Sequence, residues 1–210
     1  MRVRQGELFA VPAEAATTAE LVLQPHQLLS WQERISTFQA PLFLAAAGGE
    51  AGACEAEGQG WLFVESAVPT AGPPCGPAQA DSPDLLALVP QPLSFWRWPE
   101  APQRGAAIYL VIDQPPHLSS PLLLYVGETG RADRRWKGEH DCKSYLAAYG
   151  DALRRCHLAS GLSIRFWVDV PVAVRPRRAL EQRLIRHWQP PFNKETRSRW
   201  STPFTAAEPA

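Results

Sequence analysis

Residues 107–127 read AIYLVIDQPPHLSSPLLLYVG, and this stretch decides the fold of the chain. Two short apolar runs, 107–112 and 122–126, are separated by a proline-rich segment, which predicts a β-hairpin with a long, stiff loop. A symmetric loop places Tyr109 directly opposite Tyr125. Because side chains alternate along a strand, both tyrosines then share one face of the hairpin. The other face is expected to carry Ile108, Leu110, Ile112, Leu122, Leu124 and Val126.

The segments after the hairpin predict two helices with one strand between them. A helix is expected around residues 145–156, a third strand at 162–172, and a last helix that begins near Pro176 and stops before Pro190-Pro191. This order predicts an α/β fold, a small and mainly antiparallel three-stranded sheet flanked by helices, over residues 104–200. Residues 201–210 are expected to be a tail.

Residues 1–100 are expected to form an acidic region of unknown role that is partly disordered or rich in loops. The expected elements are a short amphipathic helix at 24–43, which Pro41 ends or kinks, and a strand at 60–64. Residues 45–60 and 69–83 have too few large apolar side chains to offset the entropy cost of ordering, so loops are expected there. A protein partner could bind through this region.

Charge divides the chain into an acidic half and a basic half. Residues 1–100 hold 4 Lys and Arg against 11 Asp and Glu, a net charge of −7, and residues 101–210 hold 17 against 10, a net charge of +7. A basic half suits a polyanionic partner such as nucleic acid. No run approaches the roughly 18 apolar residues of a membrane span, and the amino-terminal residues lack the apolar block of a signal peptide, so a cytoplasmic location is expected.

Cysteine spacing argues for reduced thiols, because the four cysteines form no CxxC pair. One cluster leaves open an alternative, a zinc-stabilised interaction domain. Its candidate ligands are His140, Cys142, Cys156 and His157, although their spacing departs from that of ordinary zinc ligands.

The last predicted helix carries a carboxylate on its apolar face. Glu181 shares one stripe with four core-type residues, which are Leu180, Leu184, Ile185 and Trp188. A buried carboxylate needs a partner, because an unpaired buried charge is strongly destabilising. Two explanations stay open: an ion pair with Arg177 or Arg178 one turn earlier, or a metal ion bound in a cleft.

Taken together, five short motifs in order along the second half resemble the GIY-YIG nuclease superfamily. Ala107-Ile108-Tyr109 stands at the first motif and Tyr125-Val126-Gly127 at the second. The single positions that match the family are Arg135 (with Arg134 as a competitor), Glu181 and, in PPFNK, Asn193. His140 lies one residue beyond the position of the family's histidine or tyrosine. An ordered set of this kind is more specific than any one motif.

The resemblance implies a metal-dependent endonuclease acting on DNA, with branched or damaged DNA among its candidate substrates. Glu181 is expected to hold one divalent cation, and Mg²⁺ suits a site with a single protein carboxylate. Tyr109 or Tyr125 is expected to help activate water, after the metal or a neighbour lowers its pKa, and Arg135 to bind the scissile phosphate.

Further residues follow from the same resemblance. The supporting residues are Gly127, which would let the backbone approach the substrate, Asn193, which would fix the geometry of the site, and His140 and Arg134. The residues expected to contact nucleic acid are Arg131, Lys137, Lys143, Arg177 and Arg178. The alternative function is a nucleic-acid-binding module of the same fold that lacks catalytic activity.

Overall fold

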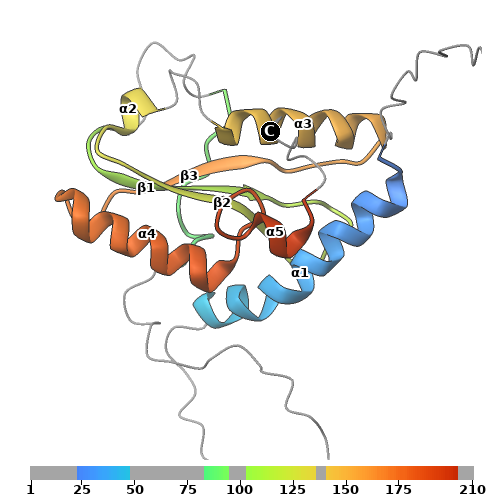
Figure 1. The fold of residues 1–210 in the computed structure, drawn as a ribbon, viewed down its shortest axis with the longest axis horizontal. Coiled ribbons are helices and arrows are strands. Elements are labelled where there is room, and N and C mark those ends of the chain that lie inside the picture. The colour runs from blue at the N-terminus through green and yellow to red at the C-terminus, as the bar shows by residue number, and fades with distance from the viewer. Residues whose placement is uncertain (1–22, 48–82, 95–102, 136–140, 203–210) are drawn as a thin grey trace, which may run out of the picture.

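The computed structural model of the chain describes residues 23–47, 83–94, 103–135 and 141–202. Three strands form one antiparallel sheet in the order β2-β1-β3: β1 (Ala107–Asp113), β2 (Leu122–Thr129) and β3 (Ser163–Trp167). Helix α3 (Asp141–Arg155) covers one face of the sheet and α4 (Val174–Trp188) covers the other (Figure 1). The predicted α/β class with a small three-stranded antiparallel sheet and flanking helices is therefore confirmed.

The hairpin forms as predicted, but its register differs by two residues. Tyr109 lies opposite Gly127, and Val111 lies opposite Tyr125. A shift of two residues preserves the face of each side chain. The two tyrosine rings therefore still share a face, where they stack with centroids 5.9 Å apart and planes at 24°.

A β-bulge in the hairpin corrects the expected faces of two leucines. The register changes by one residue between Val111 and Ile112, so β2 contains one residue more than the part of β1 with which it pairs. As a result Leu122 and Leu124 pack in the cluster of Tyr109, not on the opposite face with Leu110.

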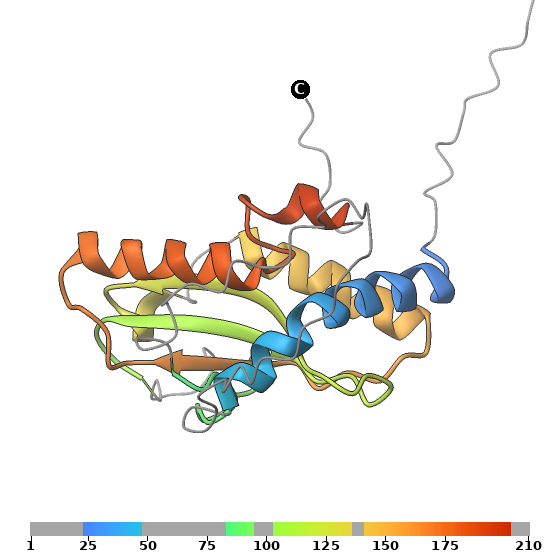
Figure 2. The same ribbon diagram turned by 90° about the horizontal axis from the view of Figure 1, so that it is seen from below.

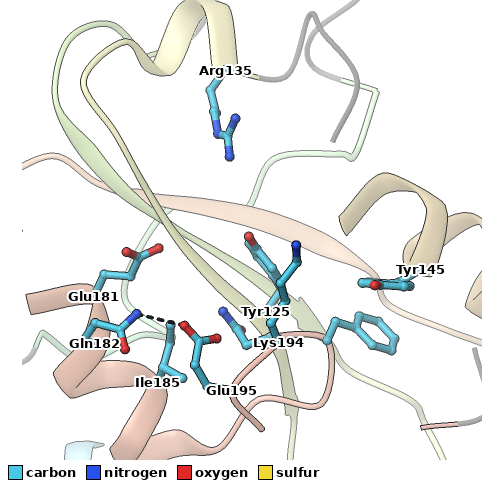
Figure 3. Close-up of a pocket in the computed structure, with 10 residues that line it drawn as sticks. Tyr125, Arg135, Tyr145, Glu181, Gln182, Ile185, Lys194 and Glu195 are labelled. Carbon is cyan, nitrogen blue, oxygen red and sulfur yellow. Dashed lines mark hydrogen bonds between the residues drawn. The ribbon is translucent and has the colours of Figure 1, made fainter. Parts of the chain in front are cut away.

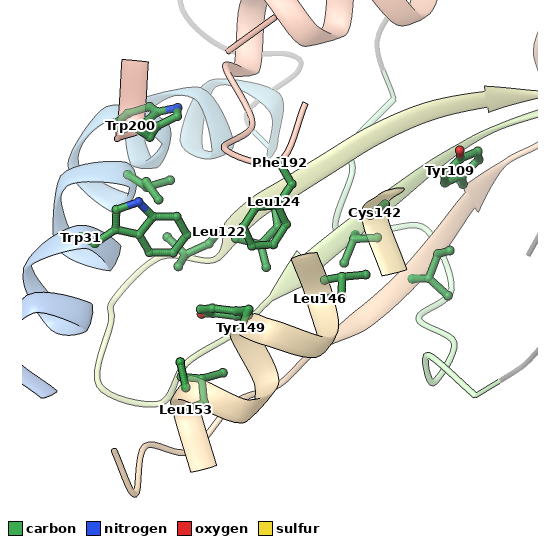
Figure 4. Packing of buried hydrophobic residues seen from close by; sticks show 14 of the residues in the cluster. Trp31, Tyr109, Leu122, Leu124, Cys142, Leu146, Tyr149, Leu153, Phe192 and Trp200 are labelled. Atoms are coloured by element: carbon green, nitrogen blue, oxygen red, sulfur yellow. The ribbon is translucent and has the colours of Figure 1, made fainter. Parts of the chain in front are cut away.

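The core has two layers, one on each face of the sheet. On the α3 face, Trp31 stacks on Phe192 with centroids 6.1 Å apart, and Tyr149 meets the same phenylalanine edge-on at 5.9 Å (Figure 4). On the other face α4 contributes the four apolar residues of its predicted stripe, Leu180, Leu184, Ile185 and Trp188, all of which are buried.

The ends of the later elements follow from their sequences. Strand β3 ends at Trp167 instead of reaching residue 172, and the segment after it is largely exposed. Helix α4 has Pro176 in its first turn, where the missing N–H has no helical partner. It ends at Trp188, because Gln189 takes a left-handed conformation with φ of 49° and Pro190-Pro191 cannot continue the helix. Two single-turn helices complete the unit, α2 (Ala132–Arg135) and α5 (Arg197–Trp200).

Helix α1 (Pro25–Ala47) belongs to the same packed unit, although it precedes the expected domain. It is longer than predicted, and Pro41 lies inside it instead of ending it. The helix runs obliquely to the strands (Figure 2). Leu28 and Ile35 join the core on the α3 face, and Phe43 joins the core on the α4 face. The packed unit therefore begins well before Arg104.

A second early segment also packs against the sheet. Gln91 forms two backbone hydrogen bonds with Ile164 at the outer edge of β3, at 2.8 and 2.9 Å. Buried Arg165 donates to the carbonyls of Leu86 and Leu88 at 2.6 and 2.7 Å. The segment around residues 85–91 thus closes this edge. The strand expected at 60–64 and nearly all of the loops expected at 45–60 and 69–83 lie outside the described residues. Among the described helices, none is long and apolar enough to cross a membrane.

Candidate active site

Residues from distant parts of the chain form hydrogen bonds with the backbone of β2 along its outer edge. The Phe192 N–H donates to the Leu124 carbonyl at 3.0 Å. The side-chain amide of buried Asn193 accepts from the Val126 N–H at 3.0 Å and donates to the Val126 carbonyl at 2.8 Å. Two residues further along β2, the Glu128 N–H donates to Glu181 Oε1 at 3.0 Å. These contacts fix α4 and the 192–193 turn against the strand, as the supporting role expected for Asn193 requires.

The carboxylate of Glu181 does not pair with the arginines one turn earlier. Arg177 and Arg178 both bind the Glu128 carboxylate instead, at 2.8 and 3.2 Å. The ion-pair explanation for Glu181 is therefore wrong, because both of its proposed partners are occupied elsewhere. The backbone of Glu128 holds Glu181 while its side chain holds the arginines.

Arg177 is a structural residue, which corrects its expected role in nucleic-acid binding. Its side chain is only 2% exposed, and its Nη1 donates to the carbonyls of Pro171 and Val172 at 3.1 and 2.6 Å. A guanidinium that is buried in this way has no surface to offer a phosphate. Arg178, by contrast, keeps 68% of its side chain exposed.

The surroundings of Glu181 favour a bound cation or a proton. The pKa of its carboxyl is raised from the usual 4.5 to about 7, mainly by burial and additionally by the negative charges of Glu128 and Glu195. The Glu128 N–H and the charge of Arg178 act in the opposite direction. This carboxyl therefore binds a proton more readily than an ordinary glutamate does, and a nearby cation would favour its charged form.

Tyr109, Gly127 and Arg135 form a tightly fitted group. A Cβ atom at Gly127 would lie 2.4 Å from both Cζ and Oη of Tyr109, so only glycine leaves room for the ring directly opposite. In the structure Gly127 makes room for Tyr109, whereas its expected role was to let the backbone approach the substrate. Arg135 Nε donates to the Tyr109 hydroxyl at 3.2 Å. Arg134 instead faces outward, 69% exposed, beside Asp133, so Arg135 is the arginine that joins the site.

Three of the four expected catalytic residues line one pocket of about 360 Å³, and these are Tyr125, Arg135 and Glu181. Tyr109 stacks on Tyr125 and reaches Arg135, so all four gather at one place from β1, β2, α2 and α4. Figure 3 shows Arg135 pointing towards the hydroxyl of Tyr125, with Glu181 at the side. The remaining lining residues are Tyr145, Gln182, Ile185, Phe192, Asn193, Lys194 and Glu195.

Neither tyrosine is easily ionised in the protein alone. Burial raises the pKa of Tyr109 to about 12, although Arg135 partly opposes this effect. Burial and the neighbouring Tyr109 raise the pKa of Tyr125 above its usual range. Arg135 thus lowers the pKa of Tyr109 as expected of a neighbour, but by less than burial raises it. Lowering of a tyrosine pKa by a bound metal stays a prediction. At neutral pH both hydroxyls are neutral and can donate one hydrogen bond and accept others.

The other expected residues divide into three groups. Arg131 is exposed and Lys143 half-buried, so both remain candidates for phosphate contacts. Lys137 and His140 lie outside the described residues. Cys142 and Cys156 are both buried, near opposite ends of α3. Fourteen residues of helix separate them by about 21 Å, which excludes a single zinc site made from both thiols.

Comparison of the chain with family models, with curated proteins and with solved structures found no match in any of the three.

Proposed function

We propose that this protein is a metal-dependent endonuclease of the GIY-YIG type, which hydrolyses phosphodiester bonds in DNA. The observation that carries the proposal is the pocket at which Tyr125, Arg135 and Glu181 meet, with Tyr109 stacked behind. These residues span 72 positions of sequence, from 109 to 181, and four separate elements. Polar or charged side chains from three separate elements, Tyr125, Arg135 and Glu181, thus line the same cavity.

The residues present fit a hydrated divalent cation. Glu181 offers a carboxylate to the pocket, and its pKa is raised mainly by burial and also by the charges of Glu128 and Glu195, so a cation beside it would be favoured. Among the described residues, no three His, Cys, Asp or Glu side chains gather to hold a metal. A single carboxylate ligand suits Mg²⁺, which keeps several of its waters. Such an ion supplies charge neutralisation for the phosphate and acidifies water in its shell.

Arg135 and the tyrosines would carry the remaining tasks. The Nε of Arg135 donates to the Tyr109 hydroxyl. The terminal amino groups of Arg135 can therefore donate to a phosphate and stabilise the charge that develops in the transition state. Tyr125 lines the pocket, where its neutral hydroxyl can orient the attacking water by hydrogen bonding. Asn193 keeps β2 and the turn after α4 in place, so it positions this group without touching the substrate.

A plasmid-nicking assay with and without Mg²⁺ tests the proposal. Conversion of supercoiled plasmid to nicked or linear DNA is expected only with the metal. DNA binding without any nicking, on plasmid and branched substrates alike, would replace the enzyme with the alternative of a catalytically inactive binding module.

The pH dependence of Mg²⁺ binding follows from the raised pKa of Glu181. A proton and a cation compete for this carboxyl, so Mg²⁺ should raise the melting temperature at pH 8 and have little effect at pH 5. The raised pKa also means that the folded protein favours the protonated carboxyl. This preference stabilises the fold below pH 4.5, and the stabilisation is lost as pH rises through about 7.

The neutral variant Glu181→Gln separates these two effects. In the absence of metal, the melting temperature of the variant minus that of the wild type should increase as the pH is raised from 5 to 8. The variant should also show no stabilisation by Mg²⁺ at either pH. Thermal melting at both pH values measures both effects, and an equal Mg²⁺ response in the two proteins would contradict the assignment of Glu181.

Salt dependence distinguishes the exposed arginines from the buried one. Each phosphate contact on duplex DNA contributes about 0.9 to the slope of log affinity against log salt. Replacing exposed Arg131 with alanine should reduce this slope by about 0.9 without changing the melting temperature. Arg177→Ala should instead destabilise the fold by about 3 kcal/mol, because it leaves the mostly buried Glu128 carboxylate without its main partner. Fluorescence anisotropy in EDTA and thermal melting measure the two effects.

A further inference from the structure

The pocket extends beyond the proposed catalytic residues to an aromatic wall. Tyr145 of α3 and Phe192 of the turn after α4 line this part, with ring centroids 6.0 Å apart. Figure 3 shows Tyr145 on the far side of Tyr125 from Glu181. Ile185 adds an apolar side chain, and Lys194 adds a cation. Nothing in the proposed hydrolysis uses this second compartment.

The aromatic wall is held in place at several points. Arg197 Nη1 donates to the Tyr145 hydroxyl at 2.8 Å, which restrains the orientation of that ring. Phe192 is almost completely buried, and its N–H is bound to the Leu124 carbonyl in β2. The wall is therefore rigidly connected to the strand that carries Tyr125. A flat ligand would lose little entropy on binding to a surface arranged in advance in this way.

The polar side of the compartment can accept and donate hydrogen bonds. Gln182 Nε2 donates to Glu195 Oε1 at 3.0 Å, and both side chains line the pocket. Their remaining amide and carboxylate atoms, together with the Lys194 ammonium, match the mixed donors and acceptors on the edge of a nucleobase. The compartment thus offers the half-buried ring of Tyr145, backed by Phe192, for a π face and polar groups for an edge.

We propose that this compartment binds the base of an unpaired nucleotide next to the scissile phosphate. The inference rests on the proposed function, because Arg135 at the other end of the pocket would then hold the adjoining phosphate. In a continuous duplex each base is stacked and paired, and turning one out of the helix is unfavourable. DNA that already has an unpaired nucleotide at the cleavage position, as in a branch, flap or bulge, avoids this cost. The enzyme therefore prefers such DNA to continuous duplex.

A binding experiment tests the compartment without relying on catalysis. Thymidine 5′-monophosphate and 2-deoxyribose 5-phosphate share the phosphate and sugar and differ by the base, and both are titrated by NMR into the full-length Glu181→Gln variant. The nucleotide is expected to bind about tenfold more tightly, or better, as stacking of one base on an aromatic ring implies. Equal affinities would overturn the proposal, whether or not the wild type cuts DNA.

Two substitutions at Tyr145 identify the ring as the source of the difference. In the same Glu181→Gln background, Tyr145→Leu keeps an apolar side chain of moderate size but removes the π face, so the preference for the nucleotide should disappear. Tyr145→Phe keeps the ring and loses only the contact with Arg197, so most of the preference should remain. A preference that survives in the leucine variant would mean that the base binds elsewhere.

A cleavage experiment tests the consequence for substrate choice. Two duplexes of the same sequence are compared, one fully paired and one with a single unpaired nucleotide at the cleavage position. The wild type is expected to cut the second at least about tenfold faster, and Tyr145→Leu should lose this advantage. Equal rates on the two duplexes would contradict the proposed specificity. Absence of cleavage on both would contradict the proposed function alone, and the binding experiment would still decide whether the compartment takes a base.

Discussion

Glu181→Gln is expected to reduce Mg²⁺-dependent cleavage at least about a thousandfold while leaving the fold and DNA binding nearly intact. A bound metal ion contributes several kcal/mol to transition-state stabilisation, and each 1.36 kcal/mol corresponds to a factor of ten in rate. Glutamine loses the charge that holds a hard cation. It keeps an oxygen in the place of Oε1, which can still accept the Glu128 N–H that closes the edge of β2. The variant therefore removes the proposed chemistry and preserves the structural contact.

Melting, DNA affinity and nicking need to be measured on the same sample of this variant. A lower melting temperature with a parallel loss of binding would indicate that the carboxylate acts through the fold alone. Glu33→Gln is a matched control, because it removes the same charge from an exposed position on α1. It should cut DNA at the wild-type rate. Undiminished nicking by Glu181→Gln would refute the assigned role.

The sequence predicted those parts of the site that depend on local periodicity. Alternation in the hairpin placed Tyr109 and Tyr125 on one face, and the result survived an error of two residues in register. The helical stripe on α4 correctly placed Glu181 beside buried Leu180 and Leu184. The partner of Glu181 could not be predicted in the same way. Arg177 is one turn away on the same helix, but it binds Glu128, 49 positions distant, in the folded chain.

The apolar residues predicted α1 as a helix, but its place in the packed unit was missed, because the buried residues that bond it to the rest of that unit are polar. Gln32 and Gln39 are both fully buried, seven residues apart on one face of the helix. Gln32 donates to the Tyr149 hydroxyl at 2.6 Å, and Gln39 donates to the carbonyls of Leu123 and Trp188 at 3.0 Å each. These partners are at least 84 positions away, so no sequence window contains the reason for burying a glutamine. Pro41 added a second misleading signal, since tertiary packing outweighs its cost within this helix.

The lining of the pocket was only partly visible in the sequence. Lys194 and Glu195 directly follow Asn193 in PPFNKE, so a wider reading of that motif would have included them. Tyr145 carried no such signal, because a tyrosine on an amphipathic helix is most simply explained as packing. The bond from Arg197, 52 positions away, distinguishes it.

Gly127→Ala is expected to damage both the fold and the site, because the new methyl group would occupy the place of the Tyr109 ring. The added Cβ would lie 2.4 Å from Cζ and Oη and 2.8 Å from Cε2 of that ring, far inside contact distance. Overpacking of this kind costs about 1–3 kcal/mol, and the upper end is expected here because β1 and β2 are paired at this position. If the ring moves instead, its hydroxyl leaves Arg135, and cleavage falls even in molecules that remain folded.

Gly150→Ala is the matched control for this substitution. Gly150 lies in α3, and a Cβ there meets nothing within 4 Å, so alanine should stabilise the protein by about 0.5–1 kcal/mol through helix propensity. A second comparison isolates the clash itself. In a Tyr109→Ala background the ring is gone, so Gly127→Ala should cost much less than it does in the wild type, and the two substitutions should couple strongly. Chemical denaturation of the four proteins in this cycle measures the coupling. Additive effects would mean that Gly127 is required for its backbone and not for the space it leaves to Tyr109, and the close fit of ring, glycine and Arg135 would then not explain how this site is built.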